Sequence, residues 1–341
     1  MARPLGRHPG PEGAQGLMAL QQERPASMGA KAAAVIFPGQ GVQRVGMGAD
    51  LYASQPAVQR AFERAAEVLG YDLASFCLQG PAAELARTRY AQPALFTLGV
   101  GIWWVLQERG VRPICAAGHS IGEFAAWVAA GALGFDEALV LVSKRGELME
   151  AATAAHEGAM SAVLGLGAQE VEAICKRAAA QGEVGPAGYN CPGQVVISGD
   201  VTAVAAAEAL ARQAGAKVVR LAVAGAFHSP LMAEAAGAFA LEVDKARIEK
   251  ASIPVAANAT GALVREADEV RQVMREQMPK PVQWEAGMRA MVALGAQVFI
   301  EAGAGRVLTG MAARIAPSVS AIGVEDAERL EQAISALKNS G

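Results

Sequence analysis

What this sequence lacks argues against several classes of protein. Only 5% of its 341 residues are aromatic and 18% are charged, and the net charge of −3 comes without a block of like charges. Such a composition does not suit a nucleic-acid-binding protein. No apolar run reaches the roughly 18 residues of a membrane-spanning helix. The four cysteines have no metal-ligand spacing, which fits a reducing compartment. We therefore expect a cytoplasmic protein with no nucleic-acid or membrane partner.

The first 30 residues lack the features of a targeting signal. They are rich in Gly, Pro, Gln and Arg and contain no apolar core, which excludes a secretory signal. The acidic residues Glu12 and Glu23 and the scarcity of serine argue against a transit peptide. We expect a disordered extension over residues 1–30.

What is present is a hydrophobic content of 52%, ample for a large core, and one dominant motif. Gly118-His119-Ser120-Ile121-Gly122 follows a short apolar run and precedes an alanine-rich helical pattern. In this strand–turn–helix context the motif predicts a nucleophile elbow, from which the serine hydroxyl projects. The helix after it directs free N–H groups toward any oxyanion formed there. The alternative is that the serine only caps this helix.

Strands and helices alternate along most of the chain. We predict strands at 32–37, 254–257 and 298–300, and helices at 56–69, 93–107, 135–152 and 307–315, besides the elbow strand and its helix to 133. Pro93 is placed in the first turn of its helix, where proline is tolerated.

The pattern changes near residue 155. Strands at 160–166, 194–198 and 217–223 alternate with helices at 168–181 and 201–215, which predicts a small ferredoxin-like insertion. We place this subdomain at 155–224. A discontinuous main domain over 31–154 and 225–320 surrounds it, and 321–341 form a C-terminal helix or tail.

A serine nucleophile needs a base, and the four histidines can be compared in turn. His8 lies in the extension, and the side chain of His119 is expected to point away from its neighbour in the turn. His156 lies in a flexible-looking link. His228, in a glycine-flanked loop before a helix, remains as the candidate base. No acidic residue close to it in sequence suggests itself as its partner, and a carbonyl can orient an imidazole equally well.

Two further features have competing interpretations. FPGQG at 37–41 ends a strand in a glycine-rich turn, but it lacks the lysine of a Walker loop and the spacing of a dinucleotide fingerprint. The alternative is that the turn brings the backbone N–H of Gln40 near a reacting group. Arg145 lies in a predicted helix, and periodicity alone predicts a solvent-facing side chain.

Eight collinear motifs between about residues 32 and 315 together resemble the malonyl-CoA:acyl-carrier-protein transacylases. They are FPGQG at 37–41, GHSIGE at 118–123, KRGELM at 144–149, GAM at 158–160, NCPGQVVISG at 190–199, FHSPLM at 227–232, PVQW at 281–284 and GAGRVLTGM at 303–311. The resemblance implies an α/β fold, with an α/β-hydrolase-like main domain and an inserted ferredoxin-like α+β subdomain.

Carried over position by position, the resemblance implies a catalytic set. Ser120 corresponds to the nucleophile and His228 to the base, and the backbone carbonyl of Gln277 orients the histidine. The backbone N–H groups of Gln40 and Ile121 form the oxyanion hole.

The resemblance also implies a set of substrate-binding residues. Arg145 corresponds to the arginine that binds the malonyl carboxylate, against the solvent-facing interpretation. Asn190, Asn258 and Phe227 match positions that line the site. Positions 121 and 226–227 resemble malonyl-selective rather than methylmalonyl-selective members. AANATG at 256–261 departs from the usual pattern, and we expect no loss of chemistry from it.

The function implied is ping-pong transfer of malonyl from malonyl-CoA to the phosphopantetheine thiol of an acyl carrier protein, for fatty-acid or polyketide synthesis. No metal or redox cofactor is required, and we expect a monomer. The alternatives are an acyl hydrolase, a catalytically silent docking subunit, and a transacylase that moves bulky acyl chains between carriers. The presence of Arg145 disfavours a hydrolase, and the intact serine and histidine disfavour a silent subunit.

Overall fold

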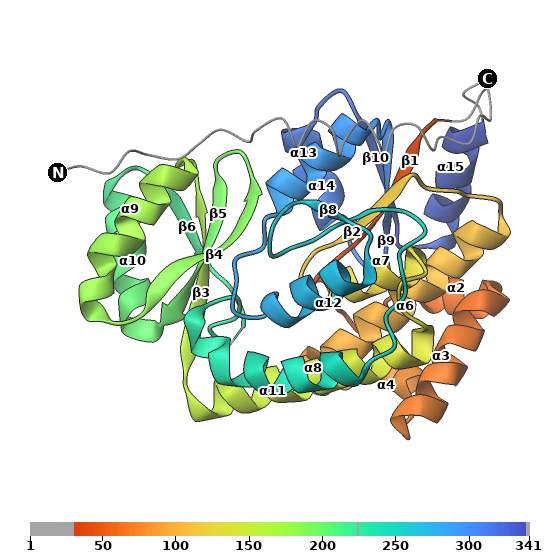
Figure 1. Ribbon diagram of the computed structural model, residues 1–341, viewed down its shortest axis with the longest axis horizontal. Coiled ribbons are helices and arrows are strands. Elements are labelled where there is room, and N and C mark those ends of the chain that lie inside the picture. Colours follow the sequence, from red (N-terminus) through yellow and green to blue (C-terminus); the bar gives the residue numbers. More distant parts are fainter. Residues whose placement is uncertain (1–30, 224, 339–341) are drawn as a thin grey trace.

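Two β-sheets, each with its own helices, organise the chain (Figure 1). The computed structural model describes residues 31–223 and 225–338. The predicted extension over residues 1–30 lies outside the described residues. Within them, no helix has both the length and the apolar character needed to cross a bilayer.

The larger sheet is mostly parallel and has the order β10-β9-β1-β2-β7-β8. Its strands are β1 (Ala33–Phe37), β2 (Cys115–Gly118), β7 (Val255–Ala256), β8 (Leu263–Val264), β9 (Val298–Ala302) and β10 (Ser320–Val324). All five residues of β1 are buried, as expected for a parallel strand covered on both faces. Val35 and Phe37 face one side of the sheet, while Ala34 and Ile36 face the other.

Helices cover both faces of this sheet. One face carries α2 (Ala49–Ser54), α3 (Pro56–Leu69), α4 (Leu73–Gln79), α5 (Ala82–Ala86), α6 (Thr88–Glu108), α7 (Gly122–Ala129), α8 (Phe135–Ala155), α11 (Ala233–Lys245), α12 (Ala267–Glu276) and α15 (Ala327–Lys338). The other carries α13 (Trp284–Leu294) and α14 (Val307–Ile315). This three-layer arrangement agrees with the predicted α/β main domain.

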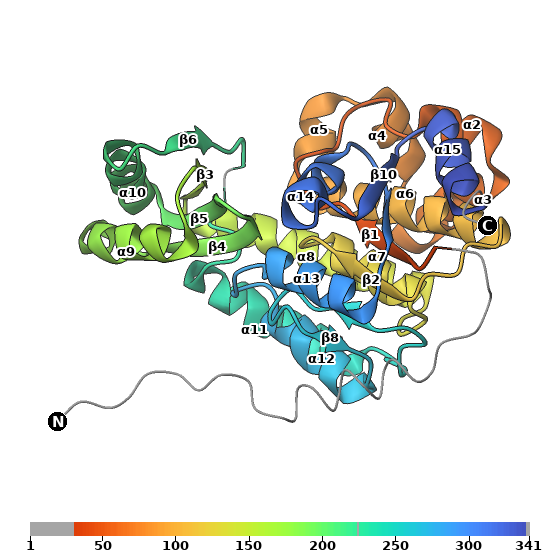
Figure 2. The same ribbon diagram turned by 90° about the horizontal axis from the view of Figure 1, so that it is seen from above.

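The smaller sheet is antiparallel, has the order β4-β5-β3-β6, and lies beside the main domain in two views at right angles (Figures 1 and 2). It comprises β3 (Gly158–Leu164), α9 (Ala168–Ala178), η1 (Ala179–Gln181), β4 (Val184–Cys191), β5 (Gln194–Asp200), α10 (Val201–Gln213) and β6 (Lys217–Arg220). Val163 and Ile197 pack against α9 and α10. Met160, Ala162 and Val196 alternate with them and pack with the core of the main domain. The insertion is therefore ferredoxin-like, as predicted.

The structure differs from the sequence predictions in several elements. Strand β4 was not predicted, because Gly and Pro and two irregularities in its pairing with β5 obscure any alternation. Pro93 lies inside α6, which begins at Thr88. Helix α7 ends at Ala129 and not at 133.

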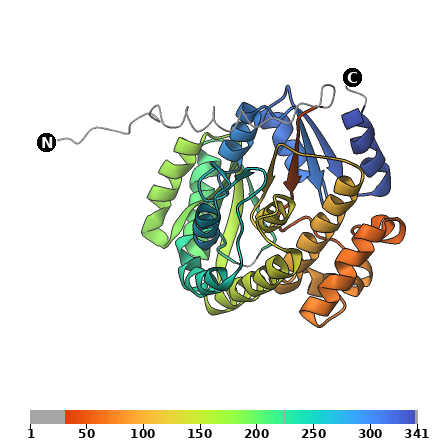
Figure 3. The same cartoon turned by 45° about the vertical axis from the view of Figure 1, so that its right-hand side comes forward.

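The C-terminal segment was expected to be a helix or tail over 321–341. The structure adds a strand that was not predicted, since β10 pairs in parallel with β9 from Ser320 to Val324. Helix α15 then packs against β10. Figure 3 shows this dark-blue helix beside the blue strands at the edge of the sheet. The sheet of the main domain therefore extends beyond the boundary placed at 320.

Candidate active site

Ser120 occupies the sharp turn between β2 and α7. Its backbone has φ +52°, a left-handed conformation that non-glycine residues seldom adopt. A Cβ on Gly118 would lie 1.9 Å from the backbone carbon of Gly122, and one on Gly122 would lie 2.2 Å from the carbonyl oxygen of Phe37. Glycine is therefore required on both sides of the turn. Among the described residues the Ser120 hydroxyl contacts His228 and Arg145 and no N–H of α7, so the capping interpretation is wrong.

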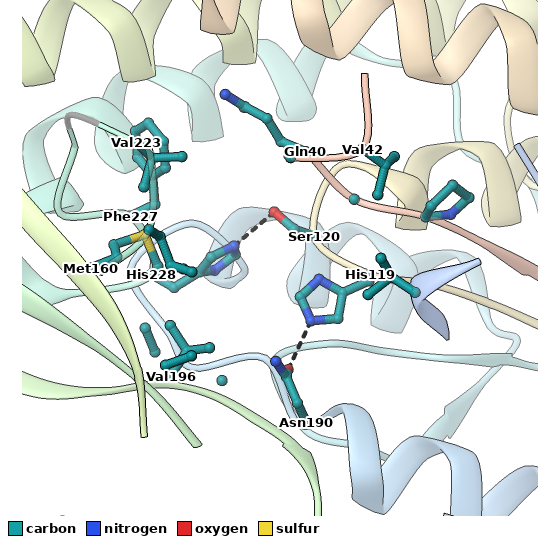
Figure 4. Close-up of a pocket in the computed structure, with 18 of the residues that line it drawn as sticks. Gln40, Val42, His119, Ser120, Met160, Asn190, Val196, Val223, Phe227 and His228 are labelled. Atoms are coloured by element: carbon teal, nitrogen blue, oxygen red, sulfur yellow. Dashed lines mark hydrogen bonds between the residues drawn. The ribbon is translucent and has the colours of Figure 1, made fainter. Parts of the chain in front are cut away.

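His228 meets this serine from a loop before η2 (Pro230–Met232), in a backbone conformation of φ +57°. Its Nε2 lies 2.7 Å from Ser120 Oγ (Figure 4). Its Nδ1 lies 3.2 Å from the carbonyl oxygen of Gln277 and 3.1 Å from that of Lys280. Two acceptors at Nδ1 fix the proton there and leave the Nε2 lone pair for the serine hydroxyl.

The environment of His228 keeps its imidazole neutral. Burial above all, with the electrostatic effects of Arg145 and His119, lowers the pKa of His228 to about 3, although the hydrogen bonds to the two carbonyls oppose the shift. A neutral imidazole is the form that can accept a proton.

The other described histidines are engaged elsewhere. His119 Nε2 lies 3.0 Å from Asn190 Oδ1, and His156 pairs with Asp200 in an exposed position. His8 lies outside the described residues.

Arg145 projects from α8 into the interior and is fully buried, so the solvent-facing interpretation is wrong. Its Nη1 donates to Gln92 Oε1 at 2.9 Å, and its Nη2 donates to Gln277 Oε1 at 2.9 Å and to Ser120 Oγ at 3.2 Å. Burial lowers the pKa of Arg145 to about 10, although the charge of Glu123 opposes the shift. The guanidinium thus stays charged at neutral pH. Its Nε has no hydrogen-bond partner within the described residues.

The oxyanion-hole candidates flank the nucleophile. Gln40 lies in the turn after β1 and lines the cavity, and Ile121 directly follows Ser120. Neither backbone N–H donates to another group in the part of the chain that the structure describes. Ile121 also stands at the N-terminus of α7, where the helix dipole favours negative charge.

The two predicted asparagines have different positions. Asn190 lines the cavity, as Figure 4 shows. Asn258 does not line it, contrary to the prediction. Its Oδ1 accepts from the backbone N–H of Ser120 and its Nδ2 donates to the carbonyl oxygen of Gly118, both at 2.6 Å. Asn258 therefore holds the elbow in shape and lies away from the substrate space.

Ser120 and His228 open into a cavity of about 290 Å³ between the two sheets. His119, Asn190, Gln40 and Gln194 add polar groups to its wall. The rest of the wall is apolar and includes Phe227, as predicted, with Met149, Met160, Val196, Leu221, Val223 and Met311. Such a cavity suits a short acyl group and the flexible arm that carries it.

Three participants were missed by sequence reasoning. Gln92 accepts a hydrogen bond from Arg145. The carbonyl oxygen of Lys280, like the carbonyl oxygen of Gln277, lies within hydrogen-bond distance of His228 Nδ1. Glu123, three residues after the nucleophile, is 1% exposed. Of these, only Glu123 could have been suspected from the sequence, because it is an acidic residue in an otherwise apolar helical segment.

Comparisons with known proteins agree with this geometry. The acyl transferase domain model matches residues 34–331. The malonyl CoA-acyl carrier protein transacylase of Bacillus subtilis is 41% identical over 89% of this chain and 97% of its own length.

Solved structures give the same result. The malonyl CoA-acyl carrier protein transacylase of Coxiella burnetii superimposes with a TM-score of 0.89 at 38% identity, covering 92% of this chain and 100% of that one. A malonyl-transacylase solved in complex with its type II polyketide acyl-carrier protein has a TM-score of 0.86 at 39% identity, covering 90% and 99%. This chain therefore belongs to the malonyl-CoA:acyl-carrier-protein transacylase family of acyltransferases.

Proposed function

We propose that this protein transfers the malonyl group of malonyl-CoA to the phosphopantetheine thiol of an acyl carrier protein, in fatty-acid or polyketide synthesis. The observation that carries the proposal is the buried guanidinium of Arg145, 3.2 Å from the oxygen of the serine that His228 contacts. A fixed cation beside a nucleophile suits an acyl group that itself carries a carboxylate. The names of the related proteins support the same donor and acceptor.

The first half-reaction makes an ester. His228 Nε2 takes the proton of the Ser120 hydroxyl as its oxygen attacks the thioester carbonyl. The backbone N–H groups of Gln40 and Ile121 stabilise the resulting oxyanion. The tetrahedral intermediate then breaks its C–S bond, and the departing CoA sulfur receives the proton from His228. A malonyl-serine ester and free CoA thiol result.

The second half-reaction runs the same steps in reverse with a new thiol. His228 accepts the proton of the carrier's phosphopantetheine thiol, whose sulfur attacks the ester carbonyl. The C–O bond to Ser120 breaks, and His228 returns the proton to the serine oxygen. No step requires a metal ion or a redox cofactor, because both bonds exchange by proton transfer and nucleophilic attack alone. We assign the reaction to a monomer in the cytoplasm.

Arg145 supplies the donor selectivity in this proposal. Its Nε lacks a partner among residues 31–223 and 225–338, and its Nη2 contacts the serine oxygen. The guanidinium therefore retains a donor for the carboxylate of an acyl group that is esterified to that oxygen. A buried carboxylate without such a partner opposes binding. Pairing also holds the ester in one position for the incoming thiol.

An experiment with two donors tests the proposal. Wild-type protein mixed with malonyl-CoA should gain the mass of one malonyl group, and Ser120→Ala should gain none. Arg145→Ala should lose about 2–5 kcal/mol of transition-state stabilisation for malonyl-CoA, by analogy with a truncated buried ion pair. Acetyl-CoA has no carboxylate, so its turnover should hold or rise. Equal losses for both donors would show that Arg145 is structural and would remove the basis for malonyl.

A further inference from the structure

Glu123 is a buried carboxylate that the acyl-transfer steps do not use. It lies in the first turn of α7 and is 1% exposed. Its Oε1 accepts from the backbone N–H of Asn258 at 3.1 Å, and its Oε2 accepts from the side-chain amide of Gln277. Burial raises the pKa of Glu123 to about 7, while these two hydrogen bonds and the charge of Arg145 oppose the shift. Both oxygens are therefore committed to neighbours of the nucleophile.

Gln277 connects this carboxylate to the reacting groups. Its Nε2 donates both to Glu123 and, at 2.9 Å, to the carbonyl oxygen of Ser120. Its Oε1 accepts from Arg145 Nη2 at 2.9 Å. The same residue uses its backbone carbonyl to hold His228.

The amide of Gln277 has only one orientation that satisfies all its neighbours. The carbonyl oxygen of Ser120 can only accept hydrogen bonds and the guanidinium of Arg145 can only donate them; Glu123, when ionised above its pKa of about 7, also only accepts. The NH₂ group must therefore face Glu123 and Ser120, and the oxygen must face Arg145. Among the described residues Glu123 makes no direct hydrogen bond to Arg145, so this amide is the hydrogen-bonded link between them, beside the electrostatic attraction of the two charges.

We propose that Glu123 is a positioning residue for donor selectivity: by fixing the amide of Gln277, its carboxylate holds the Arg145 guanidinium against Ser120. The proposal rests on the role of Arg145 as the partner of the malonyl carboxylate. Glu123 itself touches no substrate, because both its oxygens accept hydrogen bonds from Asn258 and Gln277.

Replacing Glu123 by glutamine turns this arrangement into a conflict. A glutamine side chain offers one accepting oxygen where the carboxylate offers two, and two donors converge on it. The backbone N–H of Asn258 cannot turn away, so it retains the oxygen. The new NH₂ group then faces the NH₂ of Gln277. The Gln277 amide then either moves away from residue 123 or flips, and a flip presents a donor to the donors of Arg145.

The test compares donors in Glu123→Gln. We expect kcat/KM for malonyl-CoA to fall by about tenfold or more, the scale of a lost buried charged hydrogen bond, and that for acetyl-CoA by less than about threefold. In the Arg145→Ala background the same substitution should no longer change the ratio between the donors. Glu208→Gln is the matched control, because Glu208 is also a buried carboxylate (7% exposed) with several donors, but lies in the subdomain.

The outcomes separate this inference from the proposed function. If Arg145→Ala changes donor selectivity and Glu123→Gln does not, Glu123 has no positioning role and the malonyl assignment stands. If Arg145→Ala leaves selectivity unchanged, the proposed function fails first. Equal losses for both donors in Glu123→Gln, or the same pattern in Glu208→Gln, mean a general structural role. If Glu123→Gln does not fold, Gln277→Ala provides the test. This substitution removes the amide that links Glu123 to Arg145 and keeps the backbone carbonyl that holds His228. A larger loss for malonyl-CoA than for acetyl-CoA is then expected, and equal losses overturn the inference.

Discussion

At the scale of single residues, the site depends on two backbone conformations that cost energy. Ser120 and His228 both have positive φ, a state that costs of order 1–3 kcal/mol for a non-glycine residue. Asn258 and Gln277 hold the serine through its N–H and its carbonyl. The hydrogen bonds of neighbouring side chains thus maintain the geometry that brings the serine hydroxyl to the imidazole.

The base has a testable role separate from stability. His228→Ala should slow acylation of Ser120 by roughly 10²–10⁴, the usual contribution of a general base. The protein should stay folded, because among the described residues the imidazole makes hydrogen bonds only to Ser120 and to two backbone carbonyls. Stopped reactions followed by intact-protein mass spectrometry give the rate, and calorimetry gives the melting temperature. Acylation at the wild-type rate would exclude His228 as the base.

The pH dependence of acylation follows from the environment of His228. A histidine of ordinary pKa, about 6.5, loses its free base form as the pH falls through that value. Burial and the charges of Arg145 and His119 lower the pKa of His228 to about 3, so the free base persists well below pH 6.5. The rate of acetylation of Ser120 by acetyl-CoA should therefore be nearly constant between about pH 8 and pH 5.

Acetyl-CoA is the donor of choice in this measurement because it avoids titration effects that act through Arg145 and Glu123. Circular dichroism at each pH verifies that the protein remains folded. An inflection near pH 6.5 would show that the imidazole is exposed to water.

At the scale of helices and strands, sequence patterns predicted the elements whose signals lie within a short stretch of the chain. The apolar strand β1, the elbow and helix α3 were all placed correctly, because a short apolar run, glycine spacing and helical periodicity are local signals. Strand β4 was missed because tertiary pairing imposes an extended conformation on a Gly- and Pro-rich segment. Arg145 shows the same limit at the site. Helical periodicity cannot show that a charged residue faces an interior partner such as Gln92.

The packing of α7 on β1 gives an element-scale prediction. Gly122→Ala should destabilise the protein by about 1–3 kcal/mol, the usual cost of overpacking, because the added Cβ would lie 2.2 Å from the carbonyl oxygen of Phe37. Gly237→Ala in α11 is the control. A Cβ there meets nothing within 4 Å, so that variant should gain about 0.5–1 kcal/mol from helix propensity. Urea unfolding of both variants measures the two changes. A Gly122→Ala protein as stable as wild type would mean that α7 can move away from the sheet.

At the scale of the whole molecule, the subdomain completes the site by supplying one wall. Its sheet directs Val163 and Ile197 to its own helices and Ala162 and Val196 toward the main domain. The two sheets thus enclose a cavity that neither could form alone, with Ser120 and His228 from the main domain. Access to Ser120 therefore depends on how the subdomain packs against the main domain.

This arrangement predicts that filling the cavity from the subdomain side blocks acylation without unfolding the protein. Ala162 lines the cavity, and Ala162→Phe should slow acylation by malonyl-CoA by at least about tenfold, because a displaced thioester cannot reach the attack geometry. Val219 pairs with Ala162 across the sheet but is 42% exposed, so Val219→Phe should retain the wild-type rate. Intact-protein mass spectrometry after short incubations measures both rates, and thermal unfolding confirms that both variants are folded. If Ala162→Phe is acylated as fast as wild type, the donor reaches Ser120 by another route, and the cavity between the two sheets is not the acyl-binding space.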